Sequence, residues 1–242
     1  QLFDGPLLGA NVYKEGTETP VLPPYTILKA AGLKVGVIGV VTQETPTLVN
    51  PANVAGLTFG DPVAAVNREV ANLKALPEGK RPDIIVAEFH EGKSDVKKGE
   101  TLEEALAESG PTGIFTRIVT EVDPAVAAIF QGHTHQEYTW DGPVPGQEGK
   151  TRPILSTGSY GVNVGKVVLT VDKETNDVTQ YTQELVPVAT FAEGKTTEEM
   201  KDSSPAMEES YGIILEALQN AKEEGDVPTG AMTQTISRDY TK

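Results

Sequence analysis

The chain has 242 residues, of which 38% are hydrophobic and 23% charged, a composition typical of a globular protein that buries its own core. Its formal net charge of -15 argues against nucleic acid or an anionic membrane as a partner, because both require basic patches. There is no cysteine, which excludes disulfides, thiolate metal sites and cysteine nucleophiles. No apolar run approaches about 18 residues, so we expect no membrane span. Because the sequence opens on Gln1 instead of methionine, we expect a processed chain or a fragment.

Apolar runs bounded by turn residues predict a series of strands in the first three quarters of the chain. The run over residues 34–41 follows a turn near Gly32 and is apolar on both faces, which is typical of a sheet covered on both sides. The other predicted strands are residues 6–13, 25–31, 83–89, 124–130 and 152–159, followed by two strands within 165–188 around a turn at 173–177.

Helix signals lie between these strands. Asp61 and Pro62 form an N-cap and a first helical position. The apolar face of the helix that follows comprises Val63, Val66, Val70 and Leu73. A second helix is expected over residues 114–122, whereas residues 42–60 and 91–115 are expected to be loops, the latter with one helical turn around 102–107. Strands that alternate with helices and then give way to antiparallel strands predict an α/β sandwich with a mixed sheet.

The C-terminal quarter of the chain has a different pattern. Residues 193–204 form a polar linker, and Ser204 with Pro205 repeats the signal for the start of a helix. The expected apolar stripe of that helix is Met207, Tyr211, Ile214 and Leu218. Gly225 is expected to cap its C-terminus, and residues 226–242 resemble the opening strand of a further domain.

The chain has three histidines, and each follows a predicted strand directly. His90 comes after residues 83–89, and His133 and His135 come after 124–130. The carboxyl ends of strands are where α/β sheets bind ligands. In extended backbone His133 and His135 would point to the same side, and imidazole is a common metal ligand. Gly132 would let the backbone approach closely.

A plainer interpretation of these histidines stays open, because a histidine at a strand end is more often a hydrogen-bonded loop residue than a ligand. A two-metal site also needs carboxylates. Asp83 lies at the other end of its strand, and Glu88 and Glu91 flank His90, where a role as ligand and a role as ordinary solvated charge are equally open.

The segments "IIVAEFHEG" and "QGHTHQ" resemble the calcineurin-like metallophosphoesterases. Together with "LGANVY", "LTFGDPVAAVNREVANLKA" and "STGSYGVNVGKVVLTVD", in this order along the chain, they resemble the secreted bacterial 5'-nucleotidase family. That family includes 2',3'-cyclic phosphodiesterases and UDP-sugar hydrolases, and the resemblance covers roughly residues 6 to 240.

The resemblance implies two divalent metal ions at the carboxyl ends of the strands, where they activate water for attack on phosphorus. His90 and His133 would bind one ion and His135 the other, and the metal would be zinc, manganese, iron or cobalt. Gly132, Gly158, Tyr160 and Gly161 would belong to the loops around the site. For Tyr160 we expect packing in the core.

The chain departs from the family pattern, because the Asp-x-His motif, the bridging Asp and the Gly-Asn-His motif are absent. Asn11 is not part of such a motif, since Val12 follows it. We expect these motifs, with the catalytic histidine, upstream of Gln1. The predicted organisation is a partial four-layer metallophosphoesterase sandwich over residues 1–190, a linker and interdomain helix over 191–225, and the start of a truncated nucleotidase domain over 226–242.

The predicted function is part of a two-metal phosphoesterase that hydrolyses nucleotide phosphate esters, inactive as this chain alone. The alternatives are a cyclic-nucleotide phosphodiesterase or nucleotide-sugar hydrolase of the same family, and a non-catalytic binding or scaffold module with a degenerate metal site. The resemblance also implies a secreted, cell-surface or periplasmic location. The expected partner is a nucleotide or another phosphate ester, with no nucleic acid and no membrane span.

Overall fold

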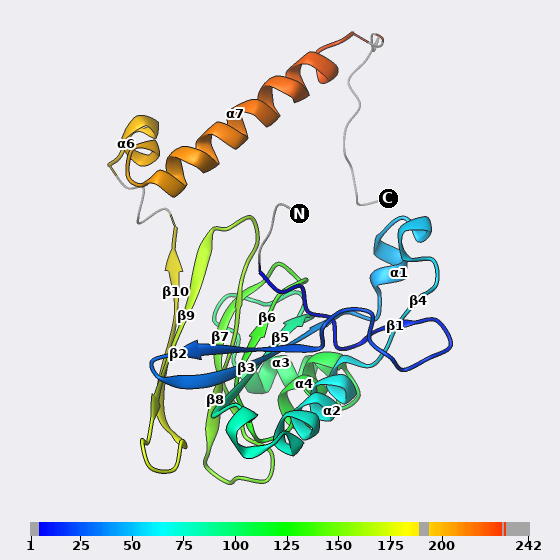
Figure 1. The fold of residues 1–242 in the computed structure, drawn as a ribbon, viewed down its shortest axis with the longest axis vertical. Coiled ribbons are helices and arrows are strands. Elements are labelled where there is room, and N and C mark those ends of the chain that lie inside the picture. Colours follow the sequence, from blue (N-terminus) through cyan, green and yellow to red (C-terminus); the bar gives the residue numbers. More distant parts are fainter. Residues whose placement is uncertain (1–4, 189–193, 229, 231–242) are drawn as a thin grey trace. The chain divides into compact units, whose positions relative to one another are not determined.

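The computed structural model describes residues 5–188, 194–228 and 230 (Figure 1). The chain divides into two compact units, residues 1–188 and residues 189–242. The first unit contains every residue of the predicted site.

A six-stranded mixed sheet forms the centre of the first unit, with the strand order β2-β3-β5-β6-β8-β7. Its inner strands β3, β5, β6 and β8 run parallel, and the edge strands β2 and β7 are antiparallel to their neighbours. The strands are β2 (Tyr25–Ala30), β3 (Leu33–Val41), β5 (Ile84–His90), β6 (Val126–Gln131), β7 (Glu137–Pro143) and β8 (Thr151–Thr157). The predicted mixed α/β sheet is therefore confirmed.

Three helices cover one face of this sheet (Figure 1): α2 (Pro62–Ala75), α3 (Leu102–Ser109) and α4 (Ile114–Glu121). Asp61 caps α2 as predicted, because its side chain accepts hydrogen bonds from the backbone N–H groups of Val63 and Ala64. The apolar face predicted for this helix is buried in the core. The helix over 114–122 is also confirmed as α4.

The hairpin of β9 (Asn163–Val171) and β10 (Val178–Pro187) packs on the opposite face of the sheet. Its side chains Val167, Leu169, Val171 and Val178 lie against Ile84, Val86 and Ala128. The described residues thus form helix, sheet and hairpin layers (Figure 1). A fourth layer of the sandwich stays a prediction.

Several local predictions in the first unit were wrong. Residues 6–13 contribute only the short strand β1 (Val12–Lys14), which pairs with β4 (Leu57–Phe59). Instead of joining one partner strand, Gly9 and Ala10 donate single backbone hydrogen bonds to Pro23 and Gly39. The predicted loop over 42–60 contains β4, α1 (Thr45–Leu48) and η1 (Pro51–Val54). Both helices have a proline in their first turn, where proline is tolerated, so these prolines do not exclude a helix.

Two further elements were missed by sequence reasoning. Helix α3 is longer than the single turn expected, and the capping box of Thr101 and Glu104 stabilises its start. Strand β7 was not predicted at all. Its signal is alternation, because Tyr138, Trp140 and Gly142 face inwards between polar residues.

Arg152 on β8 connects the sheet to the C-terminal end of α4. The residue is 1% exposed. Its Nη1 donates to the carbonyls of Asp123 and Val126, and its Nη2 donates to those of Val119 and Val122. Burial lowers the pKa of the guanidinium to about 10, so it stays protonated at neutral pH. It supplies the donors that helix-end carbonyls lack.

The second unit contains α6 (Thr197–Lys201), within the predicted linker, and α7 (Pro205–Gly225). Ser204 caps α7 as expected, accepting from the backbone of Met207. Gly225 is the last helical residue and not the cap, which is Asp226 with a φ of -82°. The predicted strand over 226–242 falls almost wholly outside the described residues. None of the helices in the described ranges combines the length and the hydrophobicity of a membrane-spanning segment.

We expect Arg152→Met to lower the free energy of unfolding by about 3 kcal/mol, because buried carbonyls would lose their donor. Urea unfolding measures the change. The matched control is Lys166→Met, which breaks an exposed ion pair with Glu184 and should cost less than about 1 kcal/mol. Equal costs for the two substitutions would contradict a central role for Arg152.

Candidate functional site

The predicted site residues lie where the parallel strands β5, β6 and β8 end. His90 is the last residue of β5, Gly132–His135 follow β6, and Gly158–Gly161 follow β8. Because β5, β6 and β8 are parallel, their carboxyl ends meet at one edge of the sheet. The structure therefore brings the three loops together, as the sequence order implies.

His90 and His133 face each other across the junction of two of these loops. Their ring centroids are 5.0 Å apart, and the rings are tilted by 55°. The backbone N–H of Gly132 donates to the carbonyl of Phe89 at 3.0 Å, which continues the β5–β6 pairing beyond the end of β6. This bond places the start of the histidine loop, residues 132–136, directly beside His90.

The backbone of the histidine loop differs from the extended conformation that the sequence suggested. His133 has a φ of 70° and His135 a φ of 60°, so both are in the left-handed region. Non-glycine residues adopt this region at a cost of roughly 1–2 kcal/mol each. The side chains therefore do not converge through alternation in a strand, and the loop must be held in place by its neighbours.

The loop after β8 lies beside His135. The rings of His135 and Tyr160 have centroids 5.8 Å apart. Tyr160 is 93% exposed, so the expectation that it packs in the core was wrong. Gly158 and Gly161 have φ values of 83° and 70°, which glycine adopts without steric cost.

The electrostatic surroundings favour a neutral His90. Burial lowers the pKa of its imidazole, nearby His133 lowers it further, and Glu91 partly opposes the shift. Glu91 is buried and accepts a hydrogen bond from the backbone of Gly92, which rules out the alternative that it is an ordinary solvated charge. A neutral imidazole keeps the lone pair that a metal ligand needs.

These donors fit part of a metal centre. His90 and His133 supply adjacent imidazole nitrogens of the kind that transition metals prefer. Within residues 5–188 and 194–228, however, no group of three or more histidine, aspartate or glutamate side chains is arranged to hold an ion. Asp83 lies at the opposite end of β5, as expected, and accepts from the backbone of Lys34.

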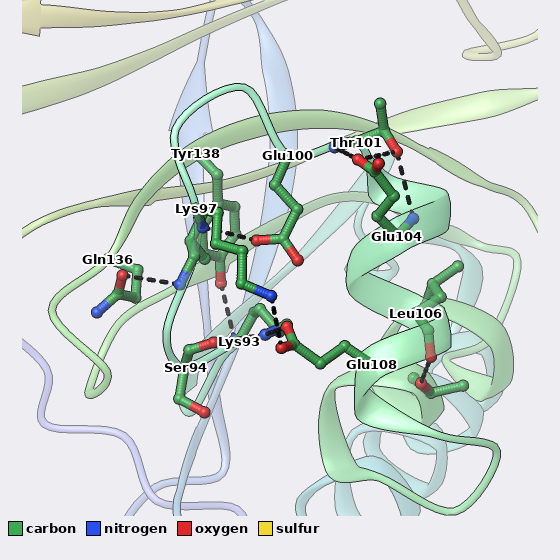
Figure 2. Close-up of polar contacts among 12 residues, drawn as sticks. Lys93, Ser94, Lys97, Glu100, Thr101, Glu104, Leu106, Glu108, Gln136 and Tyr138 are labelled. Carbon is green, nitrogen blue, oxygen red and sulfur yellow. Dashed lines mark hydrogen bonds and ion pairs between the residues drawn. The ribbon is translucent and has the colours of Figure 1, made fainter.

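The segment after His90, residues 91–101, is fixed by contacts that sequence reasoning missed (Figure 2). The hydroxyl of Tyr138 accepts from the backbone of Lys93 and donates to Oε1 of Gln131 at 2.9 Å. Glu108 on α3 forms ion pairs with Lys93 and Lys97. The hydrogen bond from Lys93, reinforced by Lys97, holds the pKa of Glu108 at about 2. The sequence signal that could have indicated these ion pairs is the capping box of α3, the helix that carries Glu108.

A cavity of about 580 Å³ lies beside the site and is lined by residues 96–100 and 135–140, including His135. A larger hollow of about 890 Å³ opens elsewhere in the first unit. Asp83, Arg152 and Tyr181 line the larger one, and the three histidines do not. The smaller cavity is therefore the one that belongs to the candidate site.

No family model matches the chain. The chain is 30% identical to a 5'-nucleotidase of Vibrio cholerae over 91% of its own length and 43% of that protein. It is also 30% identical to the endonuclease YhcR of Bacillus subtilis, over 77% of this chain and 14% of that protein. Among solved structures, the calcineurin-like phosphoesterase YfkN of Bacillus subtilis aligns with a TM-score of 0.59 at 21% identity, covering 86% of this chain and 63% of that one.

The fold is that of the calcineurin-like phosphoesterases. The relatives named 5'-nucleotidase support the resemblance of this chain to the 5'-nucleotidase family. It spans less than half the length of the Vibrio cholerae relative.

We expect the imidazole of His90 to titrate below its ordinary value of 6.5. Because the unfolded chain takes up this proton first, the stability contributed by His90 is present above that pH and is lost as pH falls through the folded pKa. NMR titration of the ring protons measures the midpoint. His133→Gln should raise it, since the lowering of the pKa by His133 is removed while those by burial and His135 remain. A midpoint at or above 6.5 in the unaltered chain would contradict the described surroundings of His90.

Gly92 lies where the segment after His90 packs against the histidine loop, and a larger residue should force these two loops apart. A Cβ at this position would lie 2.7 Å from the Tyr138 hydroxyl and 3.3 Å from the carbonyl of Gly132. Gly92→Ala is therefore expected to cost about 1–3 kcal/mol in urea unfolding. Gly79→Ala is the control, because nothing lies within 4 Å of its Cβ. A harmless Gly92→Ala would show that the loops are not tightly apposed.

Proposed function

We propose that this chain forms part of a two-metal phosphoesterase that hydrolyses phosphate esters of nucleotides. In this proposal His90 and His133 bind one divalent ion and His135 contributes to the second. The observation that carries the proposal is the pairing of His90 and His133, with ring centroids 5.0 Å apart, at the edge of the sheet where parallel strands end. Similarity to a 5'-nucleotidase supports the same chemistry.

The chain's own residues would hold and orient the ions in such a site. Neutral His90 can offer a ring nitrogen without first losing a proton, which favours binding near neutral pH. Divalent ions at this position would supply positive charge for the phosphoryl oxygens and would lower the pKa of water. That local charge would also offset the repulsion that a chain of net charge -15 exerts on an anionic substrate.

We further propose that the 242-residue chain binds metal weakly and turns over no substrate by itself. Three imidazoles do not complete a two-metal centre, and the described residues contain no cluster that would do so. In the proposal the missing carboxylate ligands belong to a longer protein. The 43% share of the Vibrio cholerae relative that the chain spans is consistent with this.

A nucleotide is the favoured substrate, because the Vibrio cholerae relative is a 5'-nucleotidase. Cyclic nucleotides and nucleotide sugars remain alternatives within the family. The relative from Bacillus subtilis is an endonuclease, but the net charge of -15 makes a polynucleotide a poor partner for this chain. A secreted or periplasmic location is part of the same proposal and follows from the family resemblance.

The alternative from another class is a binding or scaffold module that keeps the fold without catalysis. The observation in its favour is that no group of three potential ligands forms in the described parts of the chain. Metal binding distinguishes the two proposals, because a scaffold has no need of paired imidazoles.

We expect the purified chain to bind Zn²⁺ measurably in calorimetric titration, and His90→Gln or His133→Gln to weaken binding by roughly tenfold or more. Glu184→Gln, on the hairpin, is the control carboxylate and should leave the affinity unchanged. A parallel assay with a nucleoside 5'-monophosphate should detect no turnover.

Two outcomes would contradict the proposal. Chelator-sensitive hydrolysis by the 242-residue chain would show that its own residues suffice for catalysis. A complete lack of Zn²⁺ binding would remove the ligand assignment and leave the scaffold alternative.

A further inference from the structure

Gln136 is the residue at which the three strand-end loops of the site meet. Oε1 of its side chain accepts a hydrogen bond from the backbone N–H of Val96 at 3.1 Å. Its Nε2 donates to the carbonyl of Thr134, also at 3.1 Å. Figure 2 shows the Gln136 amide directed towards the segment after His90.

The backbone carbonyl of the same residue completes the junction. It accepts from the N–H of Gly158 at 2.9 Å and from the hydroxyl of Ser156 at 2.7 Å. One residue therefore binds the segment after β5, the histidine loop and the loop after β8. These are the three loops that carry the candidate ligands and their neighbours.

The histidine loop needs such an anchor because of its backbone conformation. Thr134 lies between His133 and His135, both of which have left-handed φ angles. Each of these conformations is unfavourable by roughly 1–2 kcal/mol and persists only where surrounding contacts impose it. The bond from Gln136 to the Thr134 carbonyl fixes the peptide group that joins Thr134 to His135. The bond to Val96 ties that group to the segment that begins at His90.

We propose that Gln136 is a positioning residue that sets His133 opposite His90 and His135 beside the cavity next to the site. It acts through Thr134 and Val96 and does not itself need to touch a metal ion or substrate. The role in metal binding rests on the function proposed above, whereas the positioning of the rings does not.

Substitutions can separate the two hydrogen bonds that the Gln136 side chain makes, one with Val96 and one with Thr134. Gln136→Met has a similar length and removes both hydrogen bonds. Gln136→Glu keeps an acceptor for Val96, but at pH 8 its ionised oxygen would face the Thr134 carbonyl, where the amide donates now. If positioning works through Thr134, both variants should displace the histidine loop.

Gln183 on β10 offers a matched control. Its Nε2 donates to the carbonyl of Trp140 and to Oδ1 of Asp141, each at 2.9 Å. Gln183→Met therefore also breaks two side-chain hydrogen bonds of a half-buried glutamine in the first unit. It leaves the three loops of the site untouched.

The test compares these variants by NMR and by Zn²⁺ titration. We expect the unaltered chain and Gln183→Met to show a nuclear Overhauser effect between the rings of His90 and His133, whose centroids are 5.0 Å apart. Gln136→Met and Gln136→Glu should lose this effect and bind Zn²⁺ roughly tenfold or more weakly. Should Gln136→Met fail to fold, Gln136→Glu carries the comparison, because it retains one of the two bonds.

Retention of the ring contact in the Gln136 variants, or its absence in the unaltered chain, would overturn the inference. If the unaltered chain shows the ring contact but binds no Zn²⁺, the proposed function fails. The comparison of ring contacts then still decides whether Gln136 positions the loop.

Discussion

The parallel pairing of β5 with β6 is the constraint on which the candidate site depends. It continues past the end of β6 through the hydrogen bond from Gly132 to Phe89, so the histidine loop begins beside His90. Gly132 lies 42 positions after His90 in the sequence, and the pairing of the two strands brings them together. Gly92 matters at this junction, because a Cβ there would lie 2.7 Å from the Tyr138 hydroxyl and 3.3 Å from the Gly132 carbonyl. A Cβ on Gly132 would meet nothing closer than 3.9 Å, so the expectation that Gly132 is needed for a close backbone approach was wrong. The positions of the candidate ligands are therefore set by the backbone pairing of β5 with β6.

The ends of the parallel strands are stabilised in different ways. At the amino end of β6, buried Arg152 satisfies carbonyls from α4 and the loop that follows it. At the carboxyl end, hydrogen bonds from Gln136 and Tyr138 and the ion pairs of Glu108 hold exposed loops together. The first arrangement lies in the core, whereas the second borders solvent and the cavity beside His135. This division agrees with the general pattern in which function is placed on loops that a rigid framework supports.

Local sequence patterns predicted much of this fold. The apolar runs gave the inner strands, Asp61 with Pro62 marked the start of α2, and the order of elements implied that the three histidines share an edge of the sheet. The left-handed backbone of His133 and His135 could not be predicted, because only a few per cent of non-glycine residues adopt it, even though histidine is enriched among them. The roles of Glu108 and Gln136 were also hidden. Their bonds join residues 15 and 40 positions apart, and such contacts exist only after the strands have paired.

The left-handed conformations of His133 and His135 carry a cost in folding stability, while the same residues place two imidazoles in the candidate site. Glycine at residue 133 or 135 would relieve the steric cost of the backbone, and it would remove an imidazole from the site. The two histidines therefore combine a backbone cost with the side chains that the proposed site requires. This combination matches the strained backbone that proteins concentrate at functional positions.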